Sequence, residues 1–329
     1  MTYSTGQQVQ ATDYNTFATN LNAVWGTGST DSGWGQTTIS AVSTGAIVTA
    51  TNWATLVTNL STTGSQTNTT ITSRTAPVTG NSIAILANVA TDITNCTTNR
   101  GNAASSGTEY GTFTGNVSQT ATTGIAQTTW TITWTQTVTF PSAAQARYFW
   151  NAGGRVRLQY GKSSTGTDID ADWNTFAGQC GSIYLTGRVN SAAQTIAGVS
   201  YTGTTRIGGN GGTQTTLATT TGWYQLTGTP TTIFQLNNAT SPYTGEYIQT
   251  TATQTSSTVL TLVTTWYQPA VSTVGTTCNI SGGTATTSPS TTITGTAPTT
   301  LCTYFPPSTA QGLSNSWGTP VIAATTTVA

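Results

Sequence analysis

The sequence contains no histidine and very little charge. Only 5% of its 329 residues are charged, with 8 Lys and Arg balancing 8 Asp and Glu, whereas about a quarter of an average globular protein is charged. Without imidazole the chain cannot form a Ser-His-Asp or Cys-His catalytic group. We therefore expect a non-enzymatic protein, with no catalytic residue and no cofactor.

The few basic residues are scattered singly, and only Arg155 and Arg157 are close neighbours. Binding to nucleic acid or to an anionic membrane surface depends on clustered Lys and Arg, so neither partner is expected. No apolar run approaches the ~20 residues that span a bilayer, and the start has neither the basic nor the apolar region of a signal peptide. We expect a chain that stays in the cytoplasm or is assembled there.

Cysteine is also scarce, and its spacing is not that of a metal site. Cys96, Cys180, Cys278 and Cys302 lie far apart, without a C-x-x-C pair or a histidine, which argues against zinc. Buried free thiols are the simplest interpretation. A Cys278–Cys302 disulfide is the one pairing that we consider.

Threonine and aromatic residues are abundant instead. The 10 Trp, 12 Tyr and 7 Phe set the chain apart from disordered sequences. The length is sufficient for a buried core. Threonine is β-branched and favours strands, so we expect a folded chain that is rich in β-structure.

An internal repeat marks the N-terminal part, where residues 9–21 recur as 48–60. Each copy has the apolar spacing of an amphipathic helix, with Thr12 or Thr51 as its expected N-cap. A third helix is predicted over about residues 82–99. Three amphipathic helices predict a small bundle, in which the apolar faces pack on one another or are closed by a neighbouring subunit. The interface candidates are Tyr14, Phe17, Leu21, Trp53, Leu56 and Leu60.

Alternating patterns dominate the rest of the chain. Threonine alternates with apolar residues over 128–140, which predicts a half-buried strand with Gln136 facing inward. We predict an α+β fold that is mainly β: a helical docking and oligomerisation region (1–105), an antiparallel β-sandwich or barrel-like domain (106–270), and a Thr/Ser/Pro-rich β and loop region (271–329) that ends in a tail over 323–329. Short helices are expected over 142–150 and from 172, with further strands at 155–160, 181–189, 222–227, 231–237, 245–253 and 257–268.

Three aspartates, Asp168, Asp170 and Asp172, form the one acidic cluster that is a candidate site. On a strand or loop they could bind a cation or provide a glycosidase acid pair. The interpretation that we favour is that Asp170 or Asp172 caps a helix and Asp168 faces water. Glu109 and Glu246 each lie beside a tyrosine and are expected on the surface.

Two pairs of adjacent aromatics, Trp223-Tyr224 and Trp266-Tyr267, could form exposed platforms that stack on sugars. Adjacent strand residues point to opposite faces, so one member of each pair would face outward. Burial in the core or in a subunit interface is the interpretation that we favour.

Four segments resemble structural proteins of tailed phages, especially marine and cyanobacterial ones, usually described as tail-fibre-like. They are residues 10–15, 24–36, 48–56 and 146–154, and the resemblance covers the first sixty residues and the region around 130–190. It implies a virion component without an assigned reaction.

We therefore expect a homo-oligomeric virion protein, assembled in the host cytoplasm, which contacts itself, other virion proteins, and a host surface glycan or protein. A tail fibre or tail appendage is the first interpretation, and a capsid decoration or capsid fibre is the second. A phage-borne depolymerase-like enzyme that uses Asp168, Asp170 or Asp172 is an alternative of another class, as is a cell-surface adhesin.

Overall fold

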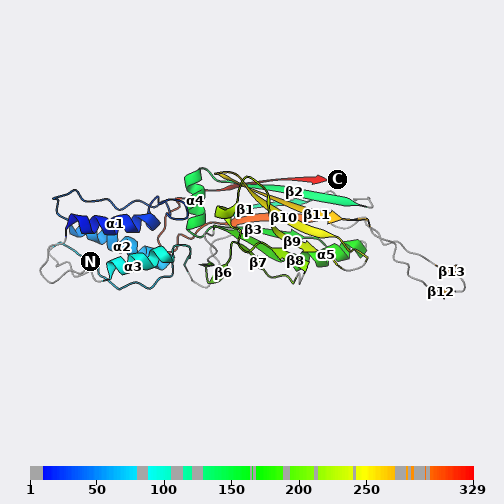
Figure 1. The fold of residues 1–329 in the computed structure, drawn as a ribbon, viewed down its shortest axis with the longest axis horizontal. Helices are drawn as coiled ribbons and strands as arrows, with labels where there is room; N and C mark the ends of the chain where they lie inside the picture. Colours follow the sequence, from blue (N-terminus) through cyan, green and yellow to red (C-terminus); the bar gives the residue numbers. More distant parts are fainter. Residues whose placement is uncertain are drawn as a thin grey trace.

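The structure is an elongated arrangement of helices at one end and β-sheets in the remainder (Figure 1). It is a computed structural model that describes residues 10–79, 88–104, 114–120, 129–163, 165, 168–187, 193–210, 214–239, 242–270, 279–280, 283–284, 293 and 297–329. The predicted α+β fold, mainly β with helices preceding antiparallel sheets, is confirmed.

Three helices form the N-terminal bundle: α1 (Ala11–Trp25), α2 (Ala50–Gln66) and α3 (Val89–Thr98). Both copies of the repeat are helical, but each helix begins earlier than predicted, so Thr12 and Thr51 lie inside the helices. The N-cap of α2 is Thr49, whose side chain accepts a hydrogen bond from the Asn52 backbone while Asn52 reaches back to Thr49. This capping box fixes the start of α2. Of the predicted third helix, residues 82–87 lie outside the described part.

The apolar helix faces close on one another within the chain. The Tyr14 ring meets the Trp53 ring edge-on at 5.3 Å, and Val89 and Ile93 of α3 belong to the same core. The small bundle predicted from the three helices is therefore present, and closure by a neighbouring subunit is not needed, because three helices supply enough apolar surface to bury it together. At most 4% of the side chain is exposed for each predicted interface residue: Tyr14, Phe17, Leu21, Trp53, Leu56 and Leu60.

An extended segment is fastened along α1 by two asparagines. The Asn22 side chain exchanges two hydrogen bonds of 2.9 Å with the backbone of Ile39. Asn15, two turns earlier, does the same with Val42 at 2.8 and 2.7 Å. Each amide satisfies a backbone donor and acceptor that have no strand partner, so the segment after α1 becomes a rigid part of the bundle.

Two antiparallel sheets pack face to face in the rest of the molecule. The six-stranded sheet consists, in spatial order, of β15 (Val321–Val328), β2 (Trp130–Thr139), β11 (Val259–Gln268), β10 (Tyr247–Ser256), β9 (Thr231–Asn237) and β8 (Thr215–Leu217). The five-stranded sheet consists of β1 (Thr114–Thr120), β14 (Thr299–Phe305), β3 (Arg155–Gly161), β4 (Ser182–Thr186) and β7 (Thr204–Ile207). The short hairpins are β5 (Gln194–Ile196) with β6 (Val199–Tyr201), and β12 (Asn279–Ile280) with β13 (Gly283–Thr284).

The alternation in β2 is confirmed, with Gln136 fully buried. Two other predictions are wrong. Residues 223–225 form a 3₁₀ turn instead of a strand, because the Gln225 side chain accepts a hydrogen bond from the Gly222 backbone at 2.9 Å and closes the chain on itself. Most of the predicted tail is β15, which pairs with β2 from Val321 to Val328. A strand with so weak an apolar alternation depends on its partner for its conformation.

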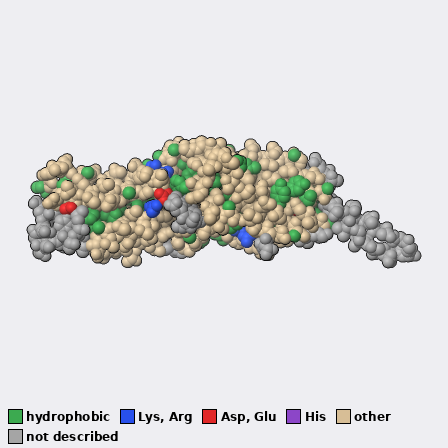
Figure 2. Space-filling model, in the orientation of Figure 1, with side chains coloured by type: hydrophobic (Ala, Val, Ile, Leu, Met, Phe, Trp, Pro, Cys, Tyr) green, Lys and Arg blue, Asp and Glu red, His purple; other side chains and the backbone are tan. Residues whose placement is uncertain are grey.

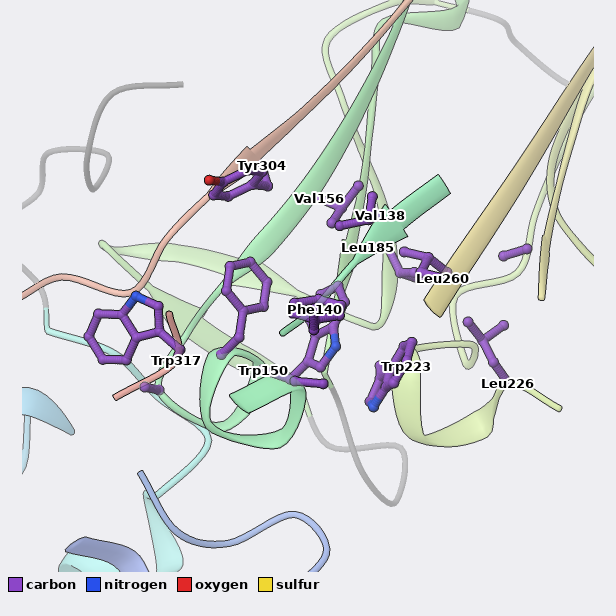
Figure 3. Packing of buried hydrophobic residues seen from close by; sticks show 14 of the residues in the cluster. Val138, Phe140, Trp150, Val156, Leu185, Trp223, Leu226, Leu260, Tyr304 and Trp317 are labelled. Atoms are coloured by element: carbon purple, nitrogen blue, oxygen red, sulfur yellow. The ribbon is translucent and has the colours of Figure 1, made fainter. Parts of the chain in front are cut away.

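Short helices close both ends of the sandwich. At one end, α4 (Ala143–Asn151) inserts Phe149 and Trp150 among aromatic rings of the sheets, and Trp150 stacks on Trp223 at 5.6 Å (Figure 3). At the other end, α5 (Asp168–Cys180) inserts Trp173, which stacks on Trp266 at 5.0 Å. These indoles extend the hydrophobic core to both rims of the sheets.

The bundle is bonded directly to the α4 end. The indole nitrogen of Trp34 donates to the carbonyl of Asn151 at 3.1 Å, and the Asn151 amide donates to the carbonyl of Gly33 at 3.2 Å. The Gln66 amide, at the end of α2, donates to the carbonyl of Ala152 at 3.2 Å. All three donors are buried, so bundle and sandwich are joined by an ordered contact.

The described cysteines are free and buried, as expected: Cys96, Cys180 and Cys302. Burial raises the pKa of Cys96 to about 11, so its thiol stays protonated and unreactive. Cys302 is a free thiol, and Cys278, its considered partner, lies outside the described residues.

Replacement of Trp53 by alanine tests the internal closure of the bundle. We expect Trp53→Ala to lower the free energy of unfolding by about 3–5 kcal/mol, the usual result of removing a large buried aromatic. Chemical denaturation followed by tryptophan fluorescence measures the change. The control is Thr58→Ala on the exposed side of α2, and equal stability of the two variants would contradict the packing described.

Candidate functional site

The predicted acidic and aromatic candidates are brought together mainly at the end of the sandwich farthest from the bundle. We call this the distal end; it consists of α5, the described residues of the β9–β10 connection (238–239 and 242–246) and the adjoining parts of β10 and β11 (Figure 1). The stacking of Trp173 on Trp266 holds α5 against the sheet here. The position of each side chain at this end follows from that contact.

The helical conformation of α5 separates the three predicted aspartates. Asp168 is exposed, Asp172 is half-buried, and Asp170 points inward. A strand or loop would have presented them together, whereas a helix turns Asp170 away from the side shared by Asp168 and Asp172. Asp168 faces water as expected, but the helix begins at Asp168, so Asp170 and Asp172 lie within it and are not caps. Among the described residues, no group of three Cys, Asp or Glu side chains is placed to hold a metal ion.

Asp170 forms an ion pair with Lys162, which follows β3. The ammonium nitrogen lies 2.5 Å from a carboxylate oxygen, and neither side chain is exposed to solvent. Two charges without access to water must neutralise each other, since solvation of either would require opening the core. The pair therefore fastens α5 to the five-stranded sheet.

The expectation that Glu246 lies on the surface is wrong. The residue is fully buried, and its carboxyl group is hydrogen-bonded to that of Asp172. The Asn238 amide donates to both carboxyl groups, at 2.9 Å to Glu246 and 3.2 Å to Asp172. A signal was present: alternation in β10 places Glu246 on the same side as the buried Ile248.

Burial and the neighbouring Asp172 raise the pKa of Glu246 from 4.5 to about 9. Burial also raises the pKa of Asp172. Two carboxyl groups in contact cannot both ionise cheaply, so the pair holds a shared proton at neutral pH. Tyr243 lies beside them, and burial and the carboxylates of Asp168, Asp172 and Glu246 raise its pKa to about 12.

The geometry of the carboxyl pair is that of a structural contact rather than that of a catalytic dyad. Glycosidase carboxyl groups lie about 5–9.5 Å apart, with substrate and water between them. Asp172 and Glu246 are in direct contact, and Glu246 has no exposed surface. The arrangement ties the β9–β10 connection to α5, next to the hydrogen bond of 2.9 Å from the Trp173 indole to Gln268.

The predicted aromatic platforms need correction. Trp223 is 3% exposed and Trp266 is 0% exposed, because both fill the ends of the core. Tyr224 is half-buried and donates a hydrogen bond of 2.6 Å to the Asn151 side chain near the bundle junction. Tyr267 does lie half-exposed on the outer face, since alternation in β11 directs it away from Trp266.

Tyr267 belongs to an ordered surface that the sequence did not reveal. Its ring stacks on that of Tyr247, its neighbour across β10, at 5.0 Å and 29°. The adjoining positions on the outer face carry amides and hydroxyls, and all are partly exposed. We call this surface the tyrosine face, defined by one row of Thr131, Tyr267, Tyr247 and Asn237 and a second row of Thr133, Thr265, Gln249 and Gln235.

Replacement of Lys162 tests the buried ion pair. Lys162→Met should lower the free energy of unfolding by about 3–5 kcal/mol, because it leaves the Asp170 carboxylate buried without its cation. The double variant Lys162→Met/Asp170→Leu should recover much of this loss. Urea denaturation of the three proteins is the measurement, and additive losses in the double variant would refute the pairing.

The shared proton of Glu246 and Asp172 makes the stability of the protein depend on pH. The folded-state pKa of Glu246 lies above its ordinary value of 4.5, so between pH 4.5 and about 9 the folded chain keeps a proton that the unfolded chain has already released. The contribution of Glu246 to the free energy of unfolding should therefore be greatest below pH 4.5 and fall as the pH rises toward 9. The chain has no histidine to mask the effect.

Glu246→Gln keeps the shape of the protonated acid and should remove most of that slope. Urea midpoints measured from pH 5 to 9 provide the test. Asp13→Asn, which alters a carboxylate of the bundle, is the control and should retain the slope. A wild-type midpoint that rises with pH in this range would contradict the shared proton.

No family model, no curated protein and no solved structure matches the chain. In the part of the chain that the structure describes, no helix is both long and apolar enough to cross a bilayer. The function is therefore argued from the geometry of the two ends of the molecule.

Proposed function

We propose that the chain is a non-enzymatic structural subunit of a bacteriophage particle, most simply a tail fibre or tail appendage. It would attach through the helical bundle and present the distal end outward. The observation that supports the proposal is that the two ends of one elongated molecule differ (Figure 1). One end is a helical bundle, and an ordered uncharged face lies toward the other. Hydrogen bonds between the bundle and α4 join the two parts.

The free end of the bundle has the features of an attachment surface. Ile47 and Val78 are large hydrophobic residues that are 83% and 62% exposed. Ile47 lies two residues before the N-cap of α2, whose other end contacts the sandwich through Gln66. Val78 follows Arg74, which pairs with Asp92 near the start of α3. Exposed apolar side chains at one end of an elongated protein favour docking there.

The uncharged surface supports a role outside the cell, where the ionic strength varies. Among the described ion pairs, Arg74–Asp92 and Lys162–Asp170 are almost wholly buried, so these charges act inside the protein. Figure 2 shows few charged side chains over a largely polar surface. Contacts made by hydroxyl and amide groups change little with ionic strength, because salt screens only charges.

Homo-oligomerisation remains part of the proposal, but it cannot use the apolar faces of the predicted interface residues, which the bundle buries. A capsid decoration or capsid fibre would use the same two ends and differs only in its position on the particle. The depolymerase alternative lacks support from the acidic residues, since Asp170 is paired with Lys162 and Asp172 with Glu246.

Labelling of purified particles tests the proposal. Gold-conjugated antibodies against the recombinant chain should bind intact particles of the phage that encodes it, at the tail or its appendages. Labelling on the capsid would select the decoration alternative. Absence of the chain from the particles, by mass spectrometry, would overturn the proposal.

A matched pair of variants tests which end attaches. Ile47→Asp/Val78→Asp should leave the recombinant fold intact and abolish incorporation into particles, because the charges oppose apolar docking. Val321→Asp, which alters a residue that is 63% exposed on the sandwich, is the control and should still be incorporated.

A further inference from the structure

The tyrosine face has a regular layout across four adjacent strands. Its two rows cross β2, β11, β10 and β9 in register. Neighbouring strands lie about 4.8 Å apart and alternate residues about 6.8 Å apart along a strand, so each row presents functional groups over about 14 Å. An extended ligand could contact several groups of a row at once.

The tyrosine pair provides a rigid amphipathic contact. The rings of Tyr247 and Tyr267 support each other at 5.0 Å, and both side chains remain partly exposed. Tyrosine offers an apolar ring and a polar hydroxyl with few rotatable bonds, so its ordering on binding costs little entropy. Such a surface suits a ligand with both C–H and O–H groups.

The amides beside the rings are oriented in advance. Gln249 donates to Gln235 at 2.8 Å, and Gln235 donates to Asn237 at 2.8 Å. This relay holds three carboxamides in fixed orientations, while Thr133 and Thr265 continue the second row with hydroxyl groups. Preorganised donors and acceptors reduce the cost of binding a polar ligand.

The absence of charge on the tyrosine face indicates the chemical class of its ligand. None of the eight side chains of the tyrosine face is charged, and the nearest acid in sequence, Glu246, points inward and shares a proton with Asp172. An anionic ligand would therefore gain no ion pair. An apolar partner would leave the amides and hydroxyls without hydrogen bonds, which is costly. A neutral polyhydroxylated chain satisfies both the polar rows and the rings.

We propose that the tyrosine face binds an uncharged polysaccharide laid across β2, β11, β10 and β9. The proposal specifies the ligand class of the surface that the proposed function turns outward, and to that extent rests on it. Binding by the isolated chain does not depend on the chain being a virion component, so the two can fail separately.

Affinity electrophoresis of the purified full chain tests the proposal, with dextran, mannan and galactan as neutral probes and alginate as the anionic probe. At least one neutral polysaccharide should retard the wild type, and alginate should not. Tyr247→Ala/Tyr267→Ala should weaken the retardation by about tenfold or more, as expected for central aromatic contacts.

Two further variants separate binding from folding. Gln249→Glu keeps both rings but introduces a charge into the second row, and it should also lose binding. Thr137→Ala/Thr261→Ala alters the same side of the sheet outside the tyrosine face and should bind like the wild type. Thermal melting checks that each variant is folded.

The proposal is overturned if no neutral polysaccharide retards the wild type, if alginate retards it more strongly, or if Tyr247→Ala/Tyr267→Ala binds unchanged. It is also overturned if that variant abolishes concentration-dependent self-association, since the face would then be an interface between copies of the chain. Particles that carry the variant should assemble normally. Absence of the chain from particles, with binding retained, would refute only the virion role.

Discussion

The stacking of helix-borne tryptophans inside the sandwich is the interaction on which the rest of the architecture depends. Two face-to-face sheets leave their ends open, and here each end is closed by an indole. Trp173 of α5 lies against Trp266, and Trp150 of α4 lies against Trp223. Large aromatic surfaces are removed from water at both rims, which gives each short helix a fixed place. The two working ends of the molecule are built on these helices: α4 carries the junction with the bundle, and α5 closes the distal end.

The scarcity of charge has its clearest consequence inside the protein. Lys162 with Asp170, and Asp172 with Glu246, connect α5 to surrounding elements by two different means. The first contact neutralises two buried charges, and the second avoids a buried charge by keeping a proton. Both depend on exclusion of water from the distal end. The outer face then remains free of charge, so its binding properties rest on tyrosine rings, amides and hydroxyls.

Local patterns predicted the elements whose periodicity was strong. The alternation of β2 and the repeated helical spacing of α1 and α2 are both present as expected, because each places a continuous apolar side toward a core. Weak patterns were misinterpreted. Residues 323–328 look like a tail, and their strand conformation comes from pairing with β2. Residues 222–227 look like a strand, but a side-chain hydrogen bond from Gly222 to Gln225 turns the chain.

The sequence by itself determined the secondary-structure content and the available side-chain chemistry. It predicts the helical start, the β-rich body, the buried thiols and the absence of imidazole chemistry. Those properties follow from composition and from contacts between near neighbours. The tertiary structure alone decided that the bundle closes internally, that Trp266 is buried while Tyr267 is partly exposed beside Tyr247, and that Glu246 meets Asp172. These outcomes join residues that are 20 to 74 positions apart, and the order of strands and the docking of α5, rather than any local preference, determine which of them meet.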